Sequence, residues 1–352
     1  ESTHQTALHL AASSNAGGEP AKAVIQDLLD LYRNAAHVQD AVDGSLPLHL
    51  IVENKYKQDW PNFGALLCHV YPRALQIPDH NGKLPLHRAT AAITHTDEPG
   101  EDYMGHSVIM NVVRLYPQAA SHVDHSSCLP LHILAMNAEI WDVQAECIYN
   151  AHPAASHART GIALQSRLPI HLAANNPDAE ESLISRLTRL HPRGASVPDR
   201  EGKLAFHLAC ESGKEWNNGL SVIHDAFPEA VRTPEENSRG WLALHMAANS
   251  EGVSASLLKK LIDLNPTAAG VMDTDGRYPL HLACDSGKVW SEGLDLLFNA
   301  YSESVSIVDK AGLLPLHIAA FRGCLGTPSP DEPDLAELEV LYQLLRADPA
   351  VL

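Results

Sequence analysis

The chain has 352 residues, of which 45% are hydrophobic and 19% are charged, a composition that supplies a core and argues against wholesale disorder. It carries 25 lysine and arginine residues against 43 aspartate and glutamate residues, so its formal net charge is −18. An acidic surface repels the phosphate backbone, so we expect protein partners, with basic surfaces, and no nucleic acid. No run of about 18 apolar residues occurs, so direct membrane insertion is not expected.

The cysteines point weakly to a reducing compartment. Six cysteines occur without any C-x-x-C pair, and no N-x-[ST] glycosylation acceptor is present. We therefore expect the cytoplasm or another reducing intracellular compartment. The chain opens at Glu1 rather than Met, so an organelle is an alternative if a targeting segment was removed.

One phrase of the form L-P-L-H-L-A recurs from end to end. Its first copy reads Thr6-Ala-Leu-His9 and its last copy reads Leu314-Pro-Leu-His317. The histidines of the nine copies are His9, His49, His87, His132, His171, His207, His245, His281 and His317. Neighbouring copies lie 36 to 45 residues apart, so the sequence predicts an array of structural repeats.

Each repeat is predicted to contain a turn and two helices. Asp and Gly, as at Asp79 and Gly82, form the turn, in which Gly takes the position of positive φ. A short helix follows and begins with Pro, whose missing N–H costs nothing there. A second, longer helix then runs to a Pro-x-Ala or Pro-x-Gly phrase, because Pro cannot continue it.

The second helix of the first repeat is predicted at residues 23–32, with Ile25, Leu28, Leu29 and Tyr32 on one face. One repeat cannot bury such a face alone, so the repeats must stack. We therefore expect an all-α fold, a single solenoid of stacked helix-turn-helix units over residues 1–352. The approximate repeats are 1–38, 39–77, 78–122, 123–158, 159–197, 198–231, 232–271, 272–307 and 308–352, the ninth of which stops where the next turn is expected.

The phrase G-x-L-P-L-H-x-A, as in Gly82-Lys-Leu-Pro-Leu-His87-Arg-Ala89, resembles the motif of ankyrin repeats. The resemblance covers essentially the whole chain and looks like the long-period variant of unicellular algae. Only Thr6 keeps the family's Thr before Pro, and Pro-x-Ala replaces the Gly that usually ends the second helix. The resemblance implies stacked helix pairs, a motif histidine that bridges backbone groups within and between repeats, and protein binding through a concave surface of turn tips and first helices.

The motif histidines admit a structural and a functional interpretation. As metal ligands or a pH sensor, they would make melting depend on zinc or on pH between about 5 and 7. We favour the structural interpretation, because a histidine at the third helical position can bond back to the unsatisfied helix start. Copies one repeat apart are also too distant to share a metal ion.

A separate metal hypothesis concerns His122, Asp124 and His125, with Cys128 and His132 nearby. No other repeat carries this set, and turns often carry such residues for solvation alone, so we expect no metal and no cofactor. The sequence also lacks G-x-S-x-G, G-x-x-x-x-G-K-[ST] and a Rossmann fingerprint, so we expect no enzyme.

The tryptophans follow the repeat. Trp141, Trp216 and Trp290 each lie nine residues after a motif histidine and Trp60 lies eleven after one, all in even-numbered repeats. We favour a packing role, filling a longer loop between the two helices; the alternative is a row of binding anchors. The family's binding mode adds cations at the turn tips, namely Lys83, Lys203, Arg239, Arg277 and Lys310. Two acidic insertions, 95–106 and 323–334, are expected to be solvated connectors or contacts to a basic partner.

The function these features predict is a non-enzymatic scaffold, adaptor or subunit of a larger assembly. The alternative is a regulatory ankyrin segment of a larger enzyme or channel whose effector domain is absent.

Overall fold

The computed structural model describes residues 5–15, 18–54, 63–92, 107–236, 239–325 and 335–349. Within these ranges the fold is all-α, as predicted, with eighteen α-helices and no β-strand. The first helices of the nine repeats are α1 (Ala7–Ser13), α3 (Pro47–Glu53), α5 (Pro85–Ala91), α8 (Pro130–Asn137), α10 (Pro169–Asn175), α12 (Ala205–Glu211), α14 (Ala243–Asn249), α16 (Pro279–Asp285) and α18 (Pro315–Leu325). The second helices are α2 (Gly18–Leu31), α4 (Gly64–Val70), α7 (Val108–Leu115), α9 (Val143–Ala151), α11 (Glu181–Leu190), α13 (Ser221–Ala226), α15 (Ala255–Leu264), α17 (Leu294–Ala300) and α19 (Leu335–Ala347).

Short turns of helix follow most of the second helices or lead into them. They are η1 (Arg33–His37), η2 (Pro72–Gln76), η3 (Pro117–Ser121), η4 (Pro153–His157), η5 (Ile162–Leu164), η6 (Pro192–Ser196), η7 (Trp216–Leu220), η8 (Pro228–Val231), η9 (Pro266–Gly270), η10 (Trp290–Glu292) and η11 (Ser302–Ser306). The predicted Pro opens a new 3₁₀ turn after six of the second helices, as Pro72 does after α4, whereas the turns after α2 and α17 begin with Arg33 and Ser302.

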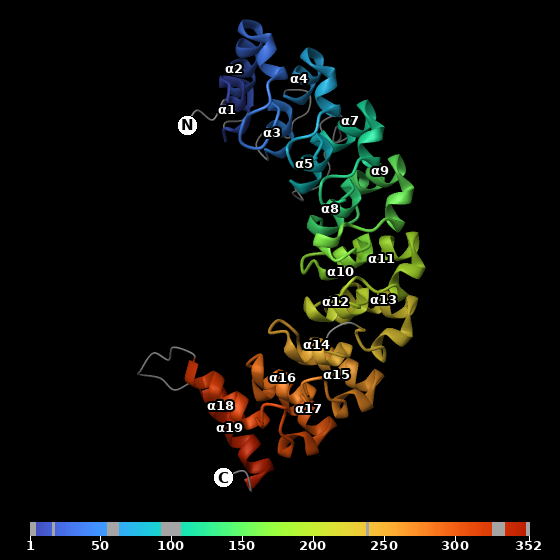
Figure 1. Cartoon of the computed structure of the whole chain (residues 1–352), viewed down its shortest axis with the longest axis vertical. Coiled ribbons are helices and arrows are strands. Elements are labelled where there is room, and N and C mark those ends of the chain that lie inside the picture. Colours follow the sequence, from blue (N-terminus) through green and yellow to red (C-terminus); the bar gives the residue numbers. More distant parts are fainter. Residues whose placement is uncertain are drawn as a thin grey trace. The chain divides into compact units, whose positions relative to one another are not determined.

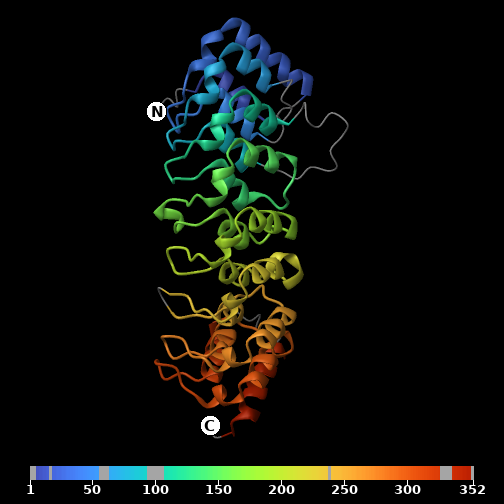
Figure 2. The ribbon, with the colours of Figure 1, turned by 90° about the vertical axis from the view of Figure 1, so that its right-hand side faces the viewer.

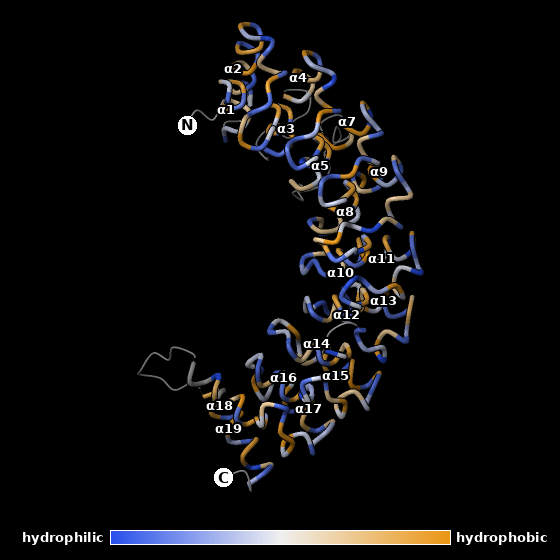
Figure 3. The backbone as a smooth tube through the Cα atoms, viewed as in Figure 1, coloured by the Kyte–Doolittle hydropathy of each residue, from blue (hydrophilic) through white to orange (hydrophobic). Residues whose placement is uncertain are grey.

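The chain forms two compact units, residues 1–173 and 174–352. In the first unit the first helices α1, α3, α5 and α8 pack side by side in chain order; in the second unit α12, α14, α16 and α18 do the same (Figure 1). Within each unit the hairpin turns project from the same edge of the helix layers (Figure 2). Hydrophobic and hydrophilic stretches alternate inside every repeat (Figure 3), which is the pattern of repeats that bury their faces against their neighbours.

An acidic side chain closes most of the hairpin turns. Asp79 N–H donates to Lys83 O (3.0 Å), and Asp79 Oδ1 accepts the N–H groups of Asn81 (2.9 Å) and Lys83 (2.8 Å). Gly82 has φ +75°, which confirms its predicted place in the turn. The same bonds recur at Asp199, Asp273 and Asp309.

The second helices are not always the longer ones. In the sixth repeat α13 has 6 residues against 7 in α12, and in the eighth α17 and α16 both have 7. In both repeats a separate short turn, which begins at Trp216 or Trp290, lies directly before the second helix. The residues of that turn replace the first turn of the second helix. The first repeat differs in the opposite sense, because α2 begins at Gly18, earlier than the predicted residue 23.

The motif histidines bond to the start of their own helix and to a carbonyl oxygen farther along the chain. In all nine, Nδ1 accepts the backbone N–H of the residue before the helix at 3.0–3.3 Å, as the sequence predicted. In the other direction, Nε2 of His207 lies 2.9 Å from Thr233 O in the next repeat, and Nε2 of His245 lies 3.0 Å from Val271 O at the end of its own repeat. Bonds of the same kind are made to the next repeat by His9, His49 and His87, and to the end of their own repeat by His132 and His281.

This arrangement requires a neutral ring. A backbone N–H can only donate, so Nδ1 must be unprotonated and Nε2 must carry the hydrogen that it donates to the carbonyl oxygen. Burial lowers the pKa of His49, His87, His207 and His245 to about 4 and also lowers the pKa of His132 and His281.

The histidine bonds predict a loss of stability in mild acid. The pKa of each of these six rings is lower in the folded chain than its ordinary value of 6.5, so the unfolded chain binds more protons below pH 6.5. The stabilisation is complete above that pH and is lost as the pH falls toward 4, at about 1 kcal/mol per buried histidine per pH unit. Thermal melting followed by circular dichroism should show Tm falling steadily from pH 7 to pH 5.

A non-titrating variant provides the control. His245→Gln lowers Tm at pH 7 because the paired bonds are lost, but its Tm should fall less steeply with acid than that of the unmodified chain. A Tm that does not change between pH 7 and pH 5 would contradict the neutral-histidine account.

Candidate functional site

Two of the five predicted tip cations are already paired with acidic residues of their own repeat. Lys203 Nζ lies 2.8 Å from Glu211 Oε2 and 3.6 Å from Glu201 Oε2. Arg277 lies 3.6 Å from Asp285 and 3.7 Å from Asp275. Each cation therefore connects the turn tip to the end of the first helix that follows it.

The other three cations have different surroundings. Arg239 is exposed, and its guanidinium lies 5.0 Å from the centre of the Trp241 ring. Lys310 is also exposed, and its Nζ donates to Thr274 O in the preceding turn. The side chain of Lys83 is half-buried beside the turn that its backbone closes.

Arg88, which the sequence did not single out, forms the densest ion cluster of the first unit. Its guanidinium lies 2.8 Å from Asp43, 2.8 Å from Glu53 and 2.5 Å from Asp79, so one side chain links two consecutive repeats. Burial raises the pKa of Asp43, but hydrogen bonds from Arg88 and Ser45 outweigh it and hold that pKa well below its usual range. Its carboxylate partners Asp43, Asp79 and Glu53 raise the pKa of Arg88, although burial alone would lower it.

In these ion pairs the cations are half-buried and most of the carboxylates are more exposed than the cations. The side chains of Arg88, Lys203 and Arg277 are 13–17% exposed. Six of their partners are 33–58% exposed: Asp43 and Glu53 in the first unit, and Glu201, Glu211, Asp275 and Asp285 in the second. We call these six residues the carboxylate face. Each unit carries its own part of it, and a partner would meet the negative end of each ion pair first.

The predicted tryptophans pack inside their own repeats. Trp141 Nε1 donates to Glu146 Oε2 (2.7 Å), Trp216 lies 5.2 Å from the ring of His224, and Trp290 lies 5.6 Å from Phe298. All three are half-buried, and Lys260 of the next repeat lies 4.9 Å from the ring of Trp216. Trp60 and the insertion 95–106 lie outside the described residues, as does 326–334 of the second insertion.

The residues of the separate metal hypothesis make other bonds. Asp124 Oδ1 accepts the N–H groups of Ser126 and Cys128 (both 2.8 Å), and His122 Nε2 lies 3.1 Å from Gly82 O. Among the described residues no group of three or more His, Cys, Asp or Glu is placed to hold a metal ion. In the same part of the chain no helix is both long and apolar enough to cross a bilayer.

Sequence reasoning missed two buried lysines and a tryptophan. Lys214 and Lys288 lie in the Gly-Lys-x-Trp phrase that the sixth and eighth repeats share; Lys288 Nζ donates to Ser250 O (2.7 Å) and Val253 O (3.2 Å) of the preceding repeat. Burial lowers the pKa of Lys214 to about 8. Trp241 is buried and donates from Nε1 to Asp273 Oδ2 (2.9 Å). The repeated Gly-Lys-x-Trp phrase was the available signal for the lysines; nothing in the sequence pairs Trp241 with Asp273.

Comparison with known proteins adds one finding. The family model for ankyrin repeats (3 copies) matches residues 244–327. No curated protein was found to match the chain. The match covers nearly all of α14 to α18. In this part the first helices pack side by side, and each motif histidine accepts the N–H before its own helix, as in the repeats outside the match.

The Arg88 cluster predicts a large effect of one substitution on the first unit. Arg88→Ala leaves Asp79 buried without its charged partner, so the free energy of unfolding should fall by about 2–3 kcal/mol in urea titrations. Arg73→Ala, at an exposed arginine of the preceding repeat, is the matched control and should change it little. Equal effects of the two substitutions would show that the cluster does not hold the repeats together.

Proposed function

The chain is an ankyrin-repeat protein, and we propose that it is a non-enzymatic scaffold or adaptor that binds a basic segment of a partner protein. Ankyrin repeats generally mediate protein–protein interaction. The proposed binding surface is the edge of the hairpin turns and the adjoining ends of the first helices. The observation that carries the proposal is the exposure of the carboxylate face, whose carboxylates are more exposed to solvent than the half-buried cations they pair with.

The repeat register supports a continuous surface in the second unit. Glu211, Asn249 and Asp285 each lie four residues after a motif histidine, on α12, α14 and α16, and all three are exposed. These helices pack side by side in chain order, so the three side chains occupy equivalent positions on successive repeats. Glu211 and Asp285 carry carboxylates, and Asn249 between them carries an amide. An extended basic segment along these helices would therefore meet a negative charge on every second repeat.

The paired cations support specificity. A lysine or arginine of the partner competes with Lys203 for Glu211, or with Arg277 for Asp285, so a partner must place its charges where the internal pairs can rearrange. Exposed charges of this kind change association rates and salt dependence strongly. Binding should therefore weaken as ionic strength rises.

Neutral variants of the carboxylate face test the proposal. The double variant Glu211→Gln/Asp285→Asn removes two of its negative charges without a change of size. Affinity capture from an extract of the source, quantified by mass spectrometry, should retain one recurring protein with basic segments on the unmodified chain. The double variant should retain about tenfold less of it, because two exposed charge contacts are together worth about 1 kcal/mol or more.

The matched control carries the same change of net charge elsewhere in the unit. Asp225→Asn/Asp263→Asn neutralises two exposed carboxylates on the second helices α13 and α15. It should capture as much partner as the unmodified chain. If both double variants captured equally less partner than the unmodified chain, the loss would be due to net charge alone. That result would contradict a binding surface at the turns.

A further inference from the structure

The sixth and eighth repeats carry the same charged pair at the same positions. In the sixth repeat, Lys203 stands directly before the motif phrase and pairs with Glu211, the last residue of α12. In the eighth repeat, Arg277 takes the place of the lysine and pairs with Asp285, the last residue of α16. The two repeats therefore present two sites of the same chemistry in the same register.

The residue after each carboxylate anchors the end of its helix. Ser212 Oγ donates to Ala174 O (2.9 Å) of the preceding repeat. Ser286 Oγ donates in the same way to Ala248 O (2.8 Å). Both carboxylates are thus presented from a helix end that is held against the repeat before it, so the two sites also share their local geometry.

The seventh repeat lies between the two sites and lacks the charged pair. Trp241 takes the position of the cation, and Asn249, the last residue of α14, takes the position of the carboxylate. The repeat still closes its turn with the bond from the Glu235 N–H to Trp241 O (2.9 Å), and His245 still bonds to its helix start. The stack therefore folds without the charged pair, which leaves the pairs of the sixth and eighth repeats available for binding.

The separation of the two carboxylates follows from the packing of the first helices. The helices α12, α14 and α16 pack side by side in chain order. Packed helices lie about 8–10 Å apart, so Glu211 and Asp285 are separated by two such steps, roughly 16–20 Å. An extended chain advances about 3.3 Å per residue and covers this distance in about five or six residues.

We propose that the two sites bind one extended segment of a partner protein in which two arginines or lysines lie about five or six positions apart. One basic side chain contacts Glu211 and the other contacts Asp285, while the residues between them pass the uncharged Asn249. The inference rests on the proposed function and adds to it the spacing of charges in the partner. Because one segment makes both contacts, the second contact forms within the complex and raises the affinity.

Peptides with a stiff spacer test the spacing in the full chain. Each labelled peptide carries two arginines joined by prolines, which hold an extended form at about 3.1 Å per residue. In the short, middle and long peptides the arginines lie about three, six and twelve positions apart. Fluorescence anisotropy at low ionic strength should show the middle peptide binding about fivefold more tightly than the other two, because only it reaches both carboxylates. Glu211→Gln or Asp285→Asn alone should remove this advantage.

A carboxylate added to the seventh repeat should change the preferred spacing. Asn249→Glu gives three successive repeats a carboxylate at the same position, so the short peptide should now bind about fivefold more tightly than it binds the unmodified chain. Asn299→Glu, at an exposed residue of the second helix α17, is the matched control for the added charge. It should leave the affinity of the short peptide unchanged.

Three results would overturn the inference. If the three peptides bound equally but all lost affinity in the double variant Glu211→Gln/Asp285→Asn, the proposed binding surface would stand without the two-site arrangement. If the short peptide gained equally in Asn249→Glu and Asn299→Glu, the gain would be due to net charge. If no peptide bound, or if each bound the double variant as tightly as the unmodified chain, the proposed function would be contradicted together with the inference.

Discussion

The repeats depend on one side chain that makes two bonds in opposite directions. The motif histidine accepts the N–H before its own helix through Nδ1 and donates through Nε2 to a carbonyl oxygen at the end of its own repeat or in the next one, as His207 does with Leu204 and Thr233. A helix that begins after Leu has no side-chain cap, so the histidine supplies one from three residues inside the helix. The ring does this only while it is neutral, which couples the bonds of His49, His87, His132, His207, His245 and His281 to the same protonation state.

This constraint explains which parts of a repeat can vary. The distance from the residue before the helix to its histidine is always three residues, and the histidine must reach the next turn. The stretch between the two helices contains no motif histidine, although Lys288 in that stretch bonds to the preceding repeat. The second helix varies in length from 6 residues in α13 to 14 in α2. The turn tips vary in side chains because their backbone bonds and one acidic residue already hold them, as Asp79 does.

Three of the variable cations share one arrangement. Arg88, Lys203 and Arg277 are held by carboxylates of the same or the preceding repeat, and most of these carboxylates are more exposed than the cation. Arg88 does this between repeats, whereas Lys203 and Arg277 do it within one. The chain has a net charge of −18, and the cations at these turns are already paired with exposed carboxylates. This excess of exposed negative charge is the physical reason to expect a basic partner.

The sequence predicted what depends on neighbours along the chain. The nine repeats, the positive φ of Gly82 and the bond from His87 back to Leu84 all follow from spacings of a few residues. The pairing of Arg88 with Asp43 joins residues 45 positions apart, so no local pattern contains it. For the same reason the sequence, which named Lys203 as a contact at a turn tip, did not reveal its pairing with Glu211.

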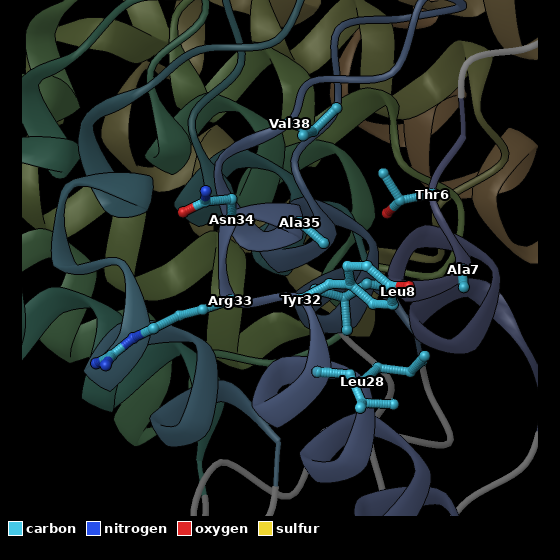
Figure 4. A pocket seen from close by; sticks show the side chains of 10 residues that line it. Thr6, Ala7, Leu8, Leu28, Tyr32, Arg33, Asn34, Ala35 and Val38 are labelled. Atoms are coloured by element: carbon cyan, nitrogen blue, oxygen red, sulfur yellow. The ribbon is translucent and has the colours of Figure 1, made fainter.

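The exposure of Tyr32 shows the same limit at the scale of a whole helix. Tyr32 is 69% exposed and, together with Leu28, lines an apolar pocket of the first repeat (Figure 4). Its counterparts in later repeats, among them Tyr71, Tyr116 and Tyr301, are half-buried. Periodicity reports which face of a helix is apolar and not whether another repeat covers it.

Cross-linking mass spectrometry of the protein isolated gently from its source tests the central claim, a binding surface at the turns and first-helix ends, most directly. The account predicts cross-links from Lys203 and Lys310, and from Lys83 in the first unit, to a lysine-rich segment of one recurring partner. Cross-links to partners that arise only from the second helices, for example from Lys259 on α15, would contradict it.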